Sequence, residues 1–166
     1  MNEHLHFFDT SALIHRYLDG PASRQVRRVI SDKRNKCFTA EPCIVEMSSA
    51  LGRRLRGQNL GHQQFDRLEK RFFADIADGS IEICALKMQD FTRARELLRY
   101  AGMVKRRRLT SFDALIACSC LDLAYSKKTR VTFCTSDNPL YTILCDIDAF
   151  TSALNLKFYP PPPHTP

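Results

Sequence analysis

Four carboxylates carry the clearest chemical signal in this sequence: Asp9, Glu46, Asp113 and Asp137. Asp9 and Asp137 each follow a short apolar run, whereas Glu46 and Asp113 lie in segments with the apolar spacing of helices. Carboxylates that are brought together repel one another, and a hard cation such as Mg²⁺ or Mn²⁺ removes that penalty by accepting their oxygens as ligands. If the fold gathers these four side chains, they would form a divalent-cation site.

Each of these acids also has an ordinary structural role open to it. Asp9 could cap the N-terminus of a helix that starts at Thr10. Asp113 has the spacing from Thr110 of a capping box, although Asp is not its usual acid. Asp137 precedes Asn-Pro and could simply begin a turn or a helix, while Glu46 could face solvent. A shared site would explain why all four acids occur directly after a strand or near the start of a helix in a chain where strands and helices alternate.

Apolar patterning predicts the elements that would position these acids. Strands are predicted at residues 4–8, 37–40, 81–84, 130–135 and 154–159, and helices at 10–18, 21–33 (beginning at Pro21), 42–57, 63–77, 90–101 and 111–125. This alternation predicts an α/β fold, a three-layer α/β/α sandwich with a mainly parallel central sheet. We expect one domain over residues 1–159 and an extended proline-rich tail at 160–166.

Such sheets bind ligands beyond the carboxyl ends of their strands, which is where Asp9 and Asp137 are predicted to lie. Glu46 falls one turn into the helix after the second strand, and Asp113 begins the helix before the strand that ends near Asp137. The hydroxyls of Ser11 and Thr135 are predicted to orient a carboxylate or a water ligand. The four acids are therefore expected at one edge of the sheet.

The charge balance points to a polyanionic partner. The chain of 166 residues has a formal net charge of +7, with basic clusters at residues 24–36, 53–56 and 105–108. Such clusters suit binding to RNA phosphates, although solvated helix faces remain an alternative for any one of them. We expect RNA contacts from Arg53, Arg54, Arg106 and Arg107.

The remaining composition excludes several classes of protein. No apolar run is long enough to span a membrane, and the N-terminus lacks the pattern of a signal peptide, so a cytoplasmic location is expected. The seven cysteines form no C-x-x-C pair and have no histidines at zinc-finger spacing. We interpret them as reduced residues of the core.

The segments around the four acids resemble those of PIN-domain ribonucleases, specifically VapC-type toxins of toxin–antitoxin pairs. The matching stretches are Phe7-Phe8-Asp9-Thr10-Ser11-Ala12-Leu13, Val45-Glu46-Met47-Ser48-Ser49-Ala50-Leu51, Asp113-Ala114-Leu115-Ile116-Ala117 and Thr135-Ser136-Asp137. The resemblance spans residues 5–158. It implies a PIN-like fold and an Mg²⁺- or Mn²⁺-dependent endoribonuclease that cleaves structured RNA, such as tRNA or rRNA, by a metal-activated water. Asp9, Glu46, Asp113 and Asp137 would then be both catalytic and metal-binding.

The same resemblance implies two protein partners, namely a second copy in a homodimer and an antitoxin that occludes the acidic site. The chain departs from the family pattern in its basic stretch at residues 105–108, in its final prolines, and in Leu140, where an aromatic residue often follows the fourth acid. None of these departures removes a carboxylate.

Two other functions share part of this pattern with the nuclease. Phosphatases of the haloacid dehalogenase type also begin with Asp after a strand, but they need a second Asp two residues later, where this chain has Ser11. A catalytically silent PIN-like module that binds RNA or protein is the remaining alternative. Cleavage that disappears with EDTA would separate the nuclease from such a module.

Overall fold

The computed structural model describes residues 4–57 and 60–160, and its centre is a five-stranded sheet. The strands are β1 (His4–Phe8), β2 (Asn35–Ala40), β3 (Glu82–Cys84), β4 (Val131–Thr135) and β5 (Leu154–Phe158), arranged in the order β3-β2-β1-β4-β5. All four neighbouring pairs are parallel, so the sheet is wholly rather than mainly parallel. The carboxyl ends of the strands consequently meet at one edge.

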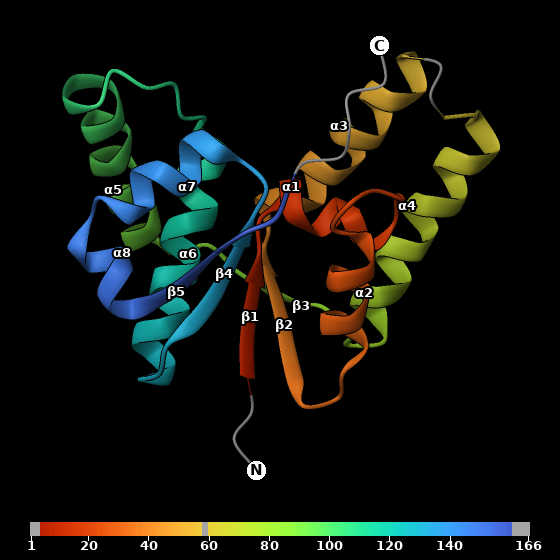
Figure 1. The fold of residues 1–166 in the computed structure, drawn as a ribbon, viewed down its shortest axis with the longest axis horizontal. Coiled ribbons are helices and arrows are strands. Elements are labelled where there is room, and N and C mark those ends of the chain that lie inside the picture. Colours follow the sequence, from red (N-terminus) through yellow and green to blue (C-terminus); the bar gives the residue numbers. More distant parts are fainter. Residues whose placement is uncertain (1–3, 58–59, 161–166) are drawn as a thin grey trace.

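Helices cover both faces of this sheet, which confirms the predicted three-layer α/β/α architecture (Figure 1). On one side lie α1 (Thr10–Leu13), the 3₁₀ helix η1 (Ile14–Arg16), α2 (Ser23–Ser31), α3 (Pro42–Arg56) and α4 (His62–Ala77). On the other side lie α5 (Met88–Arg99), the π-helix η2 (Tyr100–Val104), α6 (Ser111–Lys127), α7 (Asn138–Cys145) and α8 (Asp148–Ala153). In parallel sheets the connecting helices have to pack on the faces, because each strand must return to the same end.

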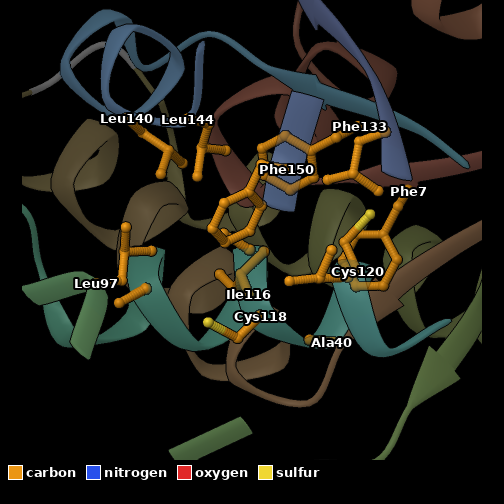
Figure 2. Close-up of a cluster of buried hydrophobic side chains, with 14 of the residues drawn as sticks. Phe7, Ala40, Leu97, Ile116, Cys118, Cys120, Phe133, Leu140, Leu144 and Phe150 are labelled. Carbon is orange, nitrogen blue, oxygen red and sulfur yellow. The ribbon is translucent and has the colours of Figure 1, made fainter. Parts of the chain in front are cut away.

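Adjacent residues of the central strands supply two separate hydrophobic cores. Phe7 and Phe133 are fully buried in the core shared with α5, α6, α7 and α8, where Figure 2 shows them beside Phe150 and Cys120. The next residues, Phe8 and Cys134, are buried in the core on the other face with α1–α4. This follows from the two-residue period of a strand and explains why the strands read as continuous apolar runs.

The structure corrects two of the predicted helices and adds two short ones. The helix expected from Pro21 begins at Ser23, because residues 20–23 form a turn in which the Gly20 N–H donates to Ser23 Oγ (2.8 Å). The helix expected over residues 10–18 is a short α1 followed by the 3₁₀ helix η1. The short helix α8 was not predicted, and α7 was foreseen only as the turn or helix that Asp137 could begin. The proline-rich segment 161–166 lies outside the described residues.

The prediction that the cysteines are reduced core residues is confirmed for five of them, whereas Cys84 is half-buried and Cys145 is exposed. All seven are free thiols, and Cys37, Cys43, Cys118, Cys120 and Cys134 are buried. Burial raises the pKa of the Cys43 thiol to about 12, so it is protonated and unreactive at neutral pH. Within the part of the chain that the structure describes, no helix has both the length and the apolar character to cross a membrane.

Candidate active site

Asp9 lies at the carboxyl end of β1 with only 2% of its surface exposed. The register pairs Phe8 with Cys134, so the next residues along, Asp9 and Thr135, lie side by side. Asp9 occupies the N-cap position of α1, yet its side chain makes no capping hydrogen bond. Its Oδ2 instead accepts hydrogen bonds from Ser11 Oγ (2.5 Å) and Thr135 Oγ1 (2.9 Å). The helix-cap interpretation is therefore wrong for Asp9.

Two backbone N–H groups determine the direction of these hydroxyl bonds. The Ser136 N–H donates to Ser11 Oγ (2.8 Å), and the Asp137 N–H donates to Thr135 Oγ1 (3.0 Å). A hydroxyl has a single hydrogen, so an oxygen that accepts a backbone N–H can direct that hydrogen elsewhere. The turn between β4 and α7 thus orients both hydroxyls as donors to Asp9, as the sequence predicted for Ser11 and Thr135.

Glu46 is half-buried on α3, and Thr10 provides its hydrogen bond. Thr10 Oγ1 donates to Glu46 Oε2 at 2.8 Å, which joins the residue after Asp9 to the second acid. Thr10 was not among the predicted site residues, although a hydroxyl directly after the first acid was the signal that could have identified it. It is itself only 7% exposed. The start of α1 therefore holds both Asp9 and Glu46.

Asp113 and Asp137 do act as helix caps, as their alternative interpretation predicted. Asp113 Oδ2 accepts from the Thr110 N–H (3.0 Å) and from Thr110 Oγ1 (2.6 Å), which in turn accepts the Asp113 N–H (3.1 Å). Asp137 Oδ1 accepts the Leu140 N–H at 2.7 Å. Each cap uses one carboxylate oxygen, so capping leaves the second oxygen of each group available for another partner.

Each of the four carboxylates feels or exerts a charge effect within the group. The pKa of Asp9 is raised to about 7, mainly by burial and also by the charges of Asp113 and Glu46, while the Ser11 and Thr135 hydrogen bonds oppose the rise. Burial and then the charge of Asp113 raise the pKa of Glu46, and burial and then Asp137 raise that of Asp113. Tertiary structure has therefore gathered like charges that local sequence keeps far apart.

This donor set fits a hard divalent cation. In each of the four acids, one carboxylate oxygen accepts all the hydrogen bonds that the side chain makes in the described part of the chain. These oxygens are Asp9 Oδ2, Glu46 Oε2, Asp113 Oδ2 and Asp137 Oδ1. Across residues 4–57 and 60–160, no three His, Cys, Asp or Glu side chains come close enough to enclose a metal ion by themselves. Mg²⁺ in proteins keeps several waters and needs only a few carboxylates. The mutual repulsion of the acids is the penalty that such an ion would remove.

Only one of the predicted RNA-contacting arginines is tied electrostatically to the acids. Arg53 is exposed on α3 seven residues after Glu46, hence on the same helix face, and its charge lowers the pKa of Glu46. Arg54 is half-buried, and its charge instead lowers the pKa of His15. Arg106 and Arg107 are exposed between η2 and α6, in the segment that leads to Asp113.

Replacement of Thr110 by alanine is expected to lower the stability of the protein, because Thr110 and Asp113 form the capping box of α6. The variant loses both hydroxyl bonds of the capping box, which should lower the free energy of unfolding by about 1 kcal/mol. Urea denaturation measures that loss, and Thr110→Ser, which retains the hydroxyl, is the matched control. A Thr110→Ala protein as stable as Thr110→Ser would contradict the capping role.

The sequence and the fold of this chain are similar to those of known proteins. The family model for the PIN domain matches residues 6–141, which include all four acids. Similar solved structures include VapBC2 from Rickettsia felis bound to a DNA fragment from its promoter, with 14% identity, a TM-score of 0.57, and coverage of 92% of this chain and 98% of that one. Another is VapC20 of Mycobacterium tuberculosis, described as a sarcin-ricin loop cleaving toxin, with 18% identity, a TM-score of 0.56, and coverage of 82% and 92%.

At these identities the two structures establish a shared fold, which confirms the predicted PIN-like architecture. No curated protein matched the sequence. The family model spans most of the chain and contains every one of the acids described above. The chain belongs to the PIN domain family.

Proposed function

We propose that this protein is a divalent-metal-dependent endoribonuclease and the toxin of a VapBC-type toxin–antitoxin pair. The observation that carries the proposal is the cluster of carboxylates at the carboxyl edge of the sheet. Asp9 is buried with its pKa raised to about 7, the charges of Asp113 and Glu46 contribute to that rise, and Asp113 in turn feels the charge of Asp137. Repulsion between these carboxylates lowers the stability of the metal-free protein. We therefore infer that the cluster has a function when a cation is bound to it. Membership of the PIN domain family supports the same conclusion.

Each part of the site would have a distinct role in phosphodiester cleavage. Asp9, Glu46 and Asp113 would hold the cation directly or through water, with Asp137 assisting. Bound there, Mg²⁺ or Mn²⁺ supplies Lewis-acid chemistry, lowering the pKa of water and offsetting phosphate charge. Ser11 and Thr135 keep Asp9 in one rotamer by donating to the same oxygen. The protein side chains thus orient the anionic groups before substrate arrives.

The substrate and partners of this chain are inferred from its similar structures. VapC20 is described as a toxin that cleaves the sarcin-ricin loop, and VapBC2 is described as bound to a DNA fragment from its promoter. We infer that the present chain cleaves structured RNA, such as tRNA or rRNA, and that an antitoxin covers its acidic site. We further infer a homodimer, for which α3 and α4 are candidate contact surfaces.

Arg53 is expected to bind RNA phosphate next to the cleavage site. Its Nη1 donates to Ser49 Oγ (3.1 Å), which holds the guanidinium along the helix face that carries Glu46. Arg53→Gln should raise KM about 3–10-fold and reduce the salt dependence of binding by about one phosphate contact, because exposed cations act through counterion release. Arg95→Gln removes a charge that is likewise exposed, on α5 and outside the three basic clusters, and serves as the control. Equal KM values for both variants would contradict this role.

Incubation of the purified, antitoxin-free protein with total RNA tests the proposal. We expect discrete cuts with Mg²⁺ or Mn²⁺ and none with EDTA, and mapping of the new ends would identify the substrate. A folded protein that binds RNA but leaves it intact under every metal condition would instead be a catalytically silent PIN-like module.

A further inference from the structure

His15 is a buried histidine that the proposed chemistry does not use. It lies in η1, six residues after Asp9, and is only 1% exposed. Its Nε2 is 3.3 Å from Ser136 Oγ, and its ring also hydrogen-bonds the backbone of Pro160. Because proline has no N–H, the Pro160 carbonyl must accept and the imidazole must donate. The ring therefore joins the chain that leaves β5 to the turn that follows β4.

Ser136 connects this histidine to the first acid. It is itself buried, at 8% exposure, and its N–H donates to Ser11 Oγ (2.8 Å). Ser11 Oγ then donates to Asp9 Oδ2 (2.5 Å). The imidazole is thus linked to the Asp9 carboxylate through the side chain of Ser136, the backbone N–H of Ser136 and the hydroxyl of Ser11. These contacts join four parts of the fold, namely the residue after β1, α1, η1 and the turn after β4.

We propose that His15 is a positioning residue for Asp9, which acts by holding Ser136 so that the Ser136 N–H keeps the Ser11 hydroxyl pointed at the carboxylate. The inference rests on the proposed nuclease function and extends it to a residue outside the acidic cluster. A neutral imidazole has one donor and one acceptor, which match the Pro160 carbonyl and the Ser136 hydroxyl. Burial, followed by the charge of Arg54, lowers the pKa of His15 and keeps the ring in this neutral form.

Glutamine and asparagine at position 15 separate the Ser136 contact from the Pro160 contact, because each amide reproduces one half of the imidazole ring. The terminal group of glutamine reaches the position of Nε2, so His15→Gln retains a partner for Ser136. Asparagine is shorter and reproduces the position of Nδ1, so His15→Asn leaves Ser136 without its partner. We expect His15→Asn and His15→Leu to lower kcat about 10–100-fold with KM within about twofold, the usual effect of losing an outer-shell hydrogen bond. His15→Gln should restore most of the wild-type kcat.

A second measurement needs neither RNA nor metal. Native-state hydrogen exchange of the Ser136 amide, followed by NMR in EDTA, reports whether the N–H remains bonded to Ser11. We expect this amide to exchange at least about tenfold faster in His15→Asn and His15→Leu and at the wild-type rate in His15→Gln. His6→Gln is the control, since His6 is a half-buried histidine of β1 with no hydrogen bond to the acidic cluster.

The outcomes are distinguishable. Wild-type kcat and Ser136 exchange in all three His15 variants would overturn the inference, as would a parallel loss of kcat and melting temperature that His15→Gln fails to rescue. If the wild-type protein cleaves no RNA, the nuclease proposal fails on its own. The Ser136 exchange rates would then still decide whether His15 positions the turn.

Discussion

Asp9→Asn is expected to reduce RNA cleavage by about 10³-fold or more while the protein remains folded. That loss corresponds to about 4 kcal/mol of transition-state stabilisation. Asparagine preserves the shape of the side chain and can still accept the Ser11 and Thr135 hydrogen bonds at its carbonyl oxygen. It cannot supply the negative charge that a cation needs, so the effect isolates charge from geometry. Single-turnover cleavage at saturating Mg²⁺ measures it.

The matched control is the same substitution at another buried acid. Asp90 is 1% exposed in the first turn of α5, where its Oδ2 accepts the Lys87 N–H (2.8 Å). Asp90→Asn should leave kcat unchanged within about twofold, since capping residues contribute to stability rather than to this chemistry. Cleavage by Asp9→Asn above about a tenth of the wild-type rate would count decisively against Asp9 as an essential group.

The second large effect is expected from pH. At limiting Mg²⁺, kcat/KM should fall about tenfold for each pH unit below 7, because the pKa of Asp9 is raised to about 7 and the protonated acid is a poor ligand. Burial raises the pKa values of Glu46 and Asp113 as well, which steepens the decline. Excess Mg²⁺ competes with protons for the same oxygens and should move the midpoint of the profile to lower pH.

The metal-free protein should show the opposite dependence in its stability. The pKa of Asp9 is about 7 in the folded state against an ordinary value of 3.8, so the folded state binds more protons over that interval. The contribution of Asp9 to the free energy of unfolding is therefore greatest below pH 4, falls as pH rises towards 7, and is level above that. Urea denaturation in EDTA measures this slope. Asp9→Asn should flatten it, and an unchanged slope would contradict the buried, unpaired state of this carboxyl.

Local sequence patterns were sufficient for the sheet and indicated which acids to propose for the site. Continuous apolar runs predict buried parallel strands because both faces of the sheet are covered, and β1, β2 and β4 lie within two residues of the predicted bounds. They were insufficient for α7 and α8, whose 8 and 6 residues are too short to display a helical period. The spacing of Thr110 and Asp113 also predicted their capping box correctly.

What only the tertiary structure decided is how the acids are held. Ser11 and Thr135 are 124 residues apart in the chain, and they meet on Asp9 because β1 and β4 are hydrogen-bonded in one register. The role of Thr10 towards Glu46, the linkage from His15 and the raised pKa of Asp9 likewise depend on groups brought together from separate elements. The sequence by itself determined which groups could do the chemistry. Their orientation and their charge state were decided by packing, because hydrogen bonds and desolvation depend on distances that no local spacing specifies.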